Sequence, residues 1–142
     1  MDSKYPATAT STINAPVSKV WDALTKPELI KQYLFGTEVD TDWQVGSPIT
    51  YRGVWEGKPY EDKGTILRFE PEHTLQYSHF SPLAGEQESP ENYHTVTITL
   101  AQEGDATLVS LTQDNNANEE AREHSEKNWN VMLEGLKKIL EQ

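Results

Sequence analysis

The sequence predicts an α+β fold in a single domain over residues 1–142, with an antiparallel sheet covered by one long C-terminal helix. Three observations support this prediction. Apolar side chains recur at intervals of three and four between residues 129 and 140, which is the period of a helix. Several segments between residues 48 and 113 alternate with a period of two, as strands do. Short turns rich in Gly, Pro and Asp separate these segments, which favours antiparallel pairing of neighbours.

The composition is typical of a globular protein. The chain has 142 residues, of which 35% are hydrophobic and 25% charged, and it contains no cysteine, so it has neither disulfides nor thiol chemistry. No apolar run approaches the ~18 residues that a membrane span needs, and the first residues lack the layout of a signal peptide. A cytoplasmic location is therefore the default expectation. The net charge of −11 argues against nucleic acids and anionic membrane surfaces as partners, because both bind basic side chains.

The N-terminal part predicts one strand and two short helices. The strand covers residues 7–14, a segment that is rich in Thr and contains Ile13 near its end. The helices cover residues 15–25 and 26–34, and in each a proline stands at the first turn, where its missing N–H costs nothing. The side chains expected to face the core are Val17, Val20, Trp21 and Leu24 in the first helix and Leu29, Ile30, Tyr33 and Leu34 in the second.

Five further strands and the last helix follow. The strands are expected at residues 48–55, 64–70, 74–80, 93–100 and 107–113. Strand 64–70 leaves two alternatives open, since either Leu67 and Phe69 or Ile66 can point inward. The last helix is expected over about residues 119–141, with Asn118 as its N-cap. Glutamates near its start and lysines near its end complement the helix dipole.

The strand register follows from two hairpins that share a strand. If the turn at residues 103–106 closes symmetrically, the facing pairs are Val96–Gln113, Ile98–Leu111 and Leu100–Val109. If the link at residues 81–92 also closes symmetrically, the facing pairs are Leu75–Ile98, Tyr77–Val96 and His79–His94. Both hairpins put Val96, Ile98 and Leu100 on one apolar face. A slip of one residue would reverse every side chain, so this agreement supports the register.

Five pieces of the chain, in order, resemble the START-like or SRPBCC superfamily, in the branch named after the C-terminal domain of the heat-shock-protein ATPase activator. The pieces are INAPVSKVWDALTKPELIKQYL, VGSPITYRG, GTILRFEPEHTLQYS, PENYHTVTITL and NWNVMLEGLKKIL. The resemblance implies a helix-grip fold, in which a curved antiparallel sheet wraps around the long C-terminal helix and leaves a cavity between them. It also implies diverse uses, from lipid and hormone binding through polyketide cyclisation to co-chaperone action. The fold alone therefore does not decide the function.

The inner face of the last helix changes character along its length. It is apolar from Trp129 to Leu140 but small or polar upstream, at Ala121, His124, Ser125 and Asn128. In a helix-grip fold the upstream half would border the cavity, as an apolar pocket with a few convergent polar groups. The predicted cavity residues are Tyr51, Trp55, Tyr77, His79, His94, Val96, Gln113, Ser125, Asn128 and Trp129.

Several of these residues also have a purely structural interpretation. Trp129 and Tyr77 suit an ordinary core, because aromatic side chains dominate cores. His79 and His94 suit strand positions that are hydrogen-bonded or partly exposed. The loop at residues 81–92 is either a solvated loop or a lid over the cavity.

We expect a protein that binds a small hydrophobic or amphipathic, lipid-like molecule, with no cofactor or metal and without membrane insertion. Catalysis has little support, because the chain lacks a cysteine nucleophile, a Gly-x-Ser-x-Gly elbow, a Gly-rich phosphate loop and a His-Glu-x-x-His motif. Two alternatives remain open. One is an enzyme of the polyketide cyclase or hydrolase type, with His79 or His94 as acid or base. The other is a co-chaperone-like interaction module with a chaperone partner.

Overall fold

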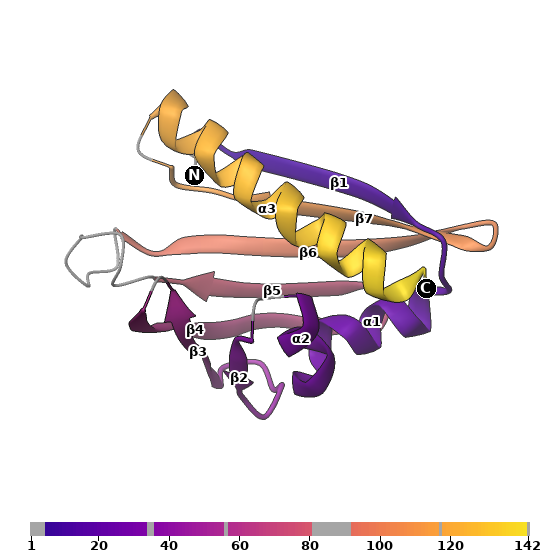
Figure 1. Ribbon diagram of the computed structural model, residues 1–142, viewed down its shortest axis with the longest axis horizontal. Coiled ribbons are helices and arrows are strands. Elements are labelled where there is room, and N and C mark those ends of the chain that lie inside the picture. Colours follow the sequence, from indigo (N-terminus) through magenta and orange to yellow (C-terminus); the bar gives the residue numbers. More distant parts are fainter. Residues whose placement is uncertain (1–4, 34–35, 56, 81–91, 117, 142) are drawn as a thin grey trace.

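The chain folds as one antiparallel sheet with its long C-terminal helix lying across one face (Figure 1). The computed structural model describes residues 5–33, 36–55, 57–80, 92–116 and 118–141. The strands are β1 (Ala7–Ile13), β2 (Glu38–Asp40), β3 (Pro48–Trp55), β4 (Lys58–Glu70), β5 (Thr74–His79), β6 (His94–Glu103) and β7 (Ala106–Gln113). The helices are α1 (Val17–Thr25), α2 (Pro27–Tyr33) and α3 (Glu119–Leu140). The predicted α+β fold, with two short helices after the first strand, is confirmed.

The seven strands run in the order β1-β7-β6-β5-β4-β3-β2, so β1 and β2 form the two edges. The predicted register of the central strands is confirmed at every pair, including Tyr77 with Val96, His79 with His94 and Val96 with Gln113. The prediction missed strand β2 and the first half of β4, while the ends of the other strands agree to within three residues. The three-residue β2 is too short to produce a periodic pattern, and β4 begins at Lys58 because Pro59, which resembles a turn residue, pairs with Val54.

A β-bulge in β4 resolves the two alternatives for this strand. The register with β5 shifts between Ile66 and Arg68, which adds one residue to the strand. As a result Ile66 is fully buried, Phe69 packs against the core, and Leu67 between them is exposed. Neither alternative was complete, because a strict period of two cannot include an extra residue.

The two short helices close the core at one end of the sheet. α1 buries Val20, Trp21 and Leu24, and the ring of Trp21 lies 5.3 Å from that of Phe69. α2 is joined to α1 by the Tyr33 hydroxyl, which donates a buried hydrogen bond of 2.8 Å to the carbonyl oxygen of Ala23. The apolar stripes predicted for both helices therefore face the core, except that Leu34 lies outside the described residues.

Helix α3 covers the free edge of β1 with charged side chains. Its N-cap is Asn118, as predicted, whose side chain accepts a 2.8 Å hydrogen bond from the N–H of Ala121. Glu126 accepts a bond from the N–H of Thr8 at 3.0 Å, Lys137 donates to the carbonyl oxygen of Thr12 at 2.8 Å, and Glu141 accepts from the N–H of Asn14 at 2.7 Å. These contacts pair backbone groups that an edge strand would otherwise offer to another chain. Among the described helices, none is long and apolar enough to cross a membrane.

The close approach of β4 to β5 makes a glycine necessary at position 64. A Cβ at Gly64 would collide with the backbone carbonyl of Ser78, whereas a Cβ at Gly53 would meet the flexible end of Tyr60, 2.7 Å from its hydroxyl. We expect Gly64→Ala to lower the free energy of unfolding by about 2 kcal/mol or more, because the backbone must shift. The matched control Gly53→Ala is expected to lose less than about 1 kcal/mol. Equal losses in urea denaturation would contradict this explanation.

The hydrogen bonds that Glu126 and Glu141 accept from the backbone of Thr8 and Asn14 predict that the stability of the fold is sensitive to acid. The N–H of Thr8, and secondarily Arg122, lowers the pKa of Glu126 below its ordinary 4.5, and the N–H of Asn14, with Lys137, lowers that of Glu141. A carboxylate with a lowered pKa in the fold stabilises it above the unfolded pKa and loses this contribution as the pH falls through the folded value.

We therefore expect the double variant Glu126→Gln/Glu141→Gln to lose less stability than the unmodified protein as the pH falls below about 4.5. Urea midpoints measured across this range provide the test. Glu123→Gln, at an exposed position of the same helix, is the control and should keep the full acid dependence. Parallel pH profiles for all three proteins would show that the hydrogen bonds of Glu126 and Glu141 do not cause the loss of stability at low pH.

Candidate ligand-binding site

The polar half of α3 is held to β7 by a network around Gln113. The Gln113 side-chain oxygen accepts a 2.6 Å hydrogen bond from the indole N–H of Trp129, and its nitrogen donates to Asn116 at 3.3 Å and to Ser125 at 3.5 Å. Ser125 in turn donates to Asn116 Oδ1 at 2.8 Å, and Asn116 donates to the carbonyl oxygen of Tyr5 at 2.8 Å. The predicted residues Gln113, Ser125 and Trp129 are thus brought together, but their polar groups bond one another.

Asn128 and His124 lie outside this network and are exposed. They occupy the flank of α3 opposite the one that holds β1. Gly135, seven residues after Asn128 and on the same flank, faces Tyr33 of α2. Asn128, two turns upstream on this flank, is exposed. Asn128 and His124 therefore border the side of the sheet towards which α2 lies.

A second cluster, which we call the β3–β5 cluster, consists of Tyr51, Asp62, Tyr77 and His79. Tyr51 faces Asp62 across the β3–β4 pair, and His79 Nε2 lies 3.1 Å from Asp62 Oδ2. The rings of Tyr51 and Tyr77 lie 5.8 Å apart. Tyr77 is buried, whereas His79 and Asp62 keep 20% and 17% of their side chains exposed. The cluster thus combines the buried ring of Tyr77 and the partly buried ring of Tyr51 with a polar pair that is partly exposed.

The tyrosines of this region are neutral over the physiological pH range. Burial raises the pKa of Tyr77 to about 12; the hydrogen bond from Tyr51 opposes this shift, and the charge of Asp62 adds to it. Burial also raises the pKa of Tyr51, and Tyr77 and Tyr33 raise it further. Tyr33, on α2, has its pKa raised by burial and by Tyr77. These phenols therefore act as neutral hydrogen-bonding groups.

Asp62 was not among the predicted site residues. The alternation of side chains along β4 places it and its neighbour Glu61 on opposite faces of the sheet. Glu61 lies on the outer face and pairs with Arg52 at 2.6 Å, while Asp62 points inward. Within the described residues, Asp62 Oδ1 is the one buried side-chain oxygen or nitrogen without a hydrogen-bond partner. A carboxylate at an inward strand position was the available signal, but the prediction did not include the half of β4 that carries it.

The other predicted residues have different surroundings. His94 faces His79 in the sheet, but its Nδ1 lies 2.9 Å from the carbonyl oxygen of Asp114, so the two histidines bond different partners. Val96 is fully buried in the core. The side chain of Trp55 lies outside the described part of the structure. The predicted lid also lies outside it, except for Asn92.

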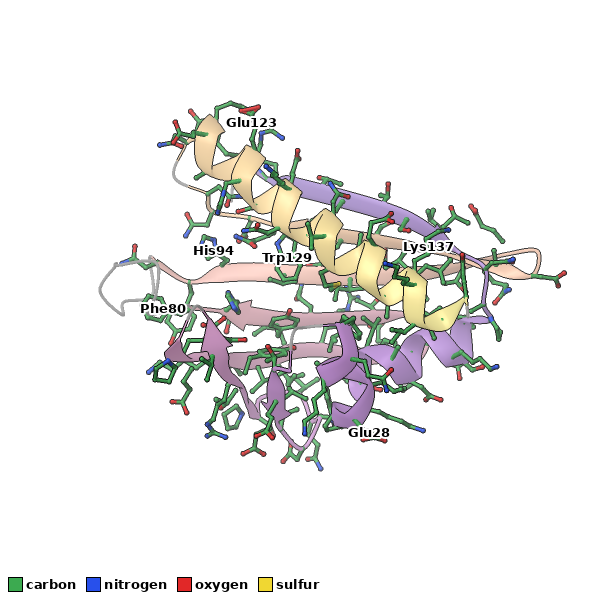
Figure 2. All side chains as sticks on the ribbon, viewed as in Figure 1. Glu28, Phe80, His94, Glu123, Trp129 and Lys137 are labelled. Carbon is green, nitrogen blue, oxygen red and sulfur yellow. The ribbon has the colours of Figure 1, made fainter. Side chains whose placement is uncertain are left out.

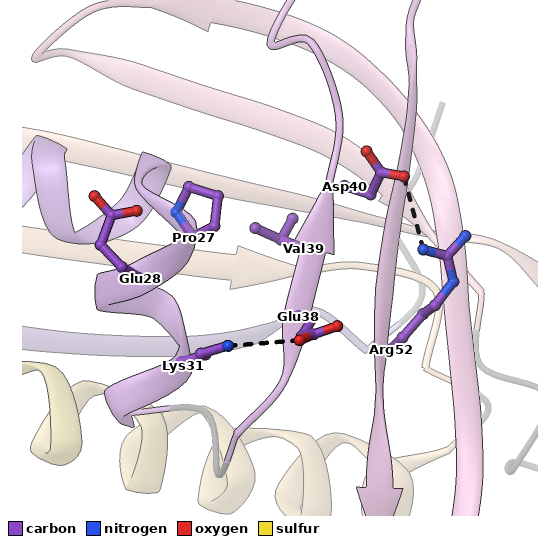
Figure 3. A pocket seen from close by; sticks show the side chains of 7 residues that line it. All are labelled: Pro27, Glu28, Lys31, Glu38, Val39, Asp40 and Arg52. Atoms are coloured by element: carbon purple, nitrogen blue, oxygen red, sulfur yellow. Dashed lines mark ion pairs between the residues drawn. The ribbon is translucent and has the colours of Figure 1, made fainter.

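Two surface hollows lie beside β2, away from the predicted residues. The first, of about 460 Å³, is lined by Pro27, Glu28, Lys31, Glu38, Val39, Asp40 and Arg52 (Figure 3). Four of its charged groups are paired, Lys31 with Glu38 at 3.5 Å and Arg52 with Asp40 at 3.7 Å. The second, of about 310 Å³, runs from Asp40 to Thr50. Among the described residues, no group of three or more His, Asp or Glu side chains could hold a metal ion.

A curved antiparallel sheet that holds a C-terminal helix, with a polar and aromatic cluster beside the helix, defines a START-like helix-grip domain. Residues 14–141 match the family described as Activator of Hsp90 ATPase homolog 1-like protein. The chain therefore belongs to this family, and the resemblance seen in the sequence is confirmed. No curated protein matches the chain.

Solved structures agree with this assignment. The chain is similar to ChR145 from Cytophaga hutchinsonii, with 58% identity, a TM-score of 0.86 and coverage of 99% of this chain and 97% of that one. It is similar to CalU16 from Micromonospora echinospora, with 25% identity, a TM-score of 0.73 and coverage of 92% and 73%. The fold is also that of Aha1 from Colwellia psychrerythraea, determined as a dimer, with 21% identity, a TM-score of 0.73 and coverage of 95% of both chains.

The Gln113 network predicts a coupled loss of stability. Gln113→Met keeps the size of the side chain but leaves the Trp129 indole N–H without its acceptor, so we expect a loss of about 1–3 kcal/mol in urea denaturation. Thr112→Val, at the exposed neighbouring position of β7, is the control and should change stability by less than about 0.5 kcal/mol. Combining Gln113→Met with Trp129→Phe should cost less than the sum of the single changes. Strict additivity would show that the two side chains do not support each other.

Proposed function

We propose that the protein binds a small hydrophobic or amphipathic molecule over the β3–β5 cluster, on the open flank of α3. The observation that carries this proposal is the incomplete cover of the sheet. Helix α3 packs along β1 and against α1 and α2. The partly exposed pair of Asp62 and His79 remains at the rim of buried aromatic rings. In Figure 2 the labels of His94, at the start of β6, and of Trp129, on α3, lie on the side of the helix towards β5.

The composition of the cluster supports binding of an amphipathic molecule. Tyr51 and Tyr77 offer ring surfaces for an apolar body, and Asp62 and His79 offer polar groups at one end. Ligand sites combine these features, with apolar walls and a few polar groups that fix orientation. The exposed side chains of His124 and Asn128 add polar groups across the opening.

The contact between Asp62 and His79 favours a second candidate, an acid–base enzyme on the same scaffold. A carboxylate that bonds one ring nitrogen of a histidine orients the ring, and the other nitrogen can then exchange a proton with a substrate. Turnover of a bound molecule that His79→Ala abolishes while binding persists would separate this candidate from simple binding. A chaperone partner, which the family name brings to mind, and a cytoplasmic location stay predictions.

Binding over the cluster predicts a defined pattern of NMR shifts. Titration of the isotope-labelled protein with 1-decanol should move the backbone signals of Tyr51, Asp62, Tyr77 and His79. Signals of Lys31 in the larger hollow, and of Val54 on the outer face, should stay in place. Tyr51→Ala should weaken the affinity by about tenfold, because it removes an aromatic contact.

The matched control is Tyr5→Ala, which removes a tyrosine that is 46% exposed and lies outside the cluster. It should leave the affinity unchanged. Shifts concentrated beside β2, or equal effects of the two tyrosine changes, would place the binding site elsewhere.

A further inference from the structure

We infer that the ligand carries a hydrogen-bond donor, an ammonium or a hydroxyl group, that binds Asp62 Oδ1, and that the site disfavours carboxylate head groups. This inference rests on the proposed function and names the chemical class of the ligand. It predicts that the preferred molecules are amphipathic amines or alcohols, in contrast to fatty acids.

The first argument is the unequal pairing of the two Asp62 oxygens. Oδ2 lies 3.1 Å from His79 Nε2, whereas Oδ1 is buried and has no partner among the described residues. A buried carboxylate oxygen without a donor is destabilising, and bonds to ionised acceptors are among the stronger hydrogen bonds in proteins. A donor that reaches Oδ1 therefore has more to gain here than at an exposed carboxylate.

The second argument is the bonding of the neighbouring groups. Neither Tyr51 nor Tyr77 donates a hydrogen bond to Asp62 Oδ1, and His79 Nε2 is engaged with Oδ2. Within the cluster, the unmet requirement among the described residues is thus for a donor at Oδ1, and none of these groups supplies it.

The third argument is the charge around the cluster. None of the described Lys or Arg side chains forms an ion pair with Asp62. The arginine on the adjacent strand, Arg52, lies on the outer face, where Glu61 and Asp40 occupy it. A carboxylate head group would meet the negative Asp62 without a Lys or Arg side chain to pair with, whereas an ammonium group would neutralise it. Opposite charges favour binding and like charges oppose it.

The test compares three probes with the same hydrocarbon chain: decylammonium, 1-decanol and decanoate, each below its micelle-forming concentration. Calorimetric titration of the full chain should give dissociation constants at least about tenfold lower for decylammonium and 1-decanol than for decanoate. Asp62→Asn, which keeps the shape of the side chain, should bring the three constants to within about threefold of one another. The control Glu61→Gln, one residue away on the outer face, should leave the tenfold preference intact.

The outcomes separate this inference from the proposed function. If decanoate binds as tightly as the other two, with NMR shifts at the β3–β5 cluster, the donor class is wrong and the binding site stands. If none of the three probes binds, the proposed function fails as well. If Asp62→Asn leaves the preference for decylammonium unchanged, that preference comes from the general acidity of the chain, and the inference is overturned. The unfolding midpoint of Asp62→Asn establishes that it is folded, and the comparison on the unmodified protein does not depend on it.

Discussion

The structure depends on one geometric constraint: a single long helix must cover a seven-stranded sheet. An α-helix with its side chains is about 10 Å across, while seven strands at about 4.8 Å spacing span nearly 30 Å. Helix α3 can therefore cover about a third of the width. Its position over β1 and against α1 and α2 protects the core at that end. In this position α3 packs against β1, α1 and α2 and not mainly against the strands that carry the β3–β5 cluster. Polar groups of the cluster can therefore stay partly exposed.

Helix α3 has three faces, and each of them makes different contacts. One flank carries Glu126 and Lys137, which bond the backbone of edge strand β1. The central stripe changes from Leu133 and Leu136, which are buried in the core, to Ser125, which is held in the Gln113 network. A buried polar network with every member paired fixes position more sharply than apolar contact, because displacement breaks directional bonds. The polar half of the helix is thus explained mainly as an anchor, and the third flank, with Asn128, is the one that faces open space.

The sequence predicted the register of the central strands to the residue, because Val96, Ile98 and Leu100 allow one register in which all three face the core. It could not predict the bulge at Ile66, because an extra residue in a strand changes no local propensity. Asp62 was missed for a related reason. Its partners come from β3 and β5, so its role depends on pairings across the sheet, and the start of β4 was hidden by Pro59. The resemblance to the family supplied the helix-grip architecture, which periodicity alone does not distinguish from other covered sheets.

The buried, unpaired oxygen of Asp62 lowers the stability of the fold. A carboxylate with a buried, unpaired oxygen lowers stability by about 1–3 kcal/mol, and a valine or threonine at an inward strand position would avoid that loss. The bond to His79 offsets part of this cost, but it uses one oxygen and exposes the pair at the rim. Where local preference and global stability both favour another residue, the conflict itself indicates a role other than folding. Gly64, two residues along β4, lies where a Cβ would collide with the carbonyl of Ser78, the residue before His79, so a close approach of β4 to β5 and an unpaired carboxylate oxygen belong to the same short segment.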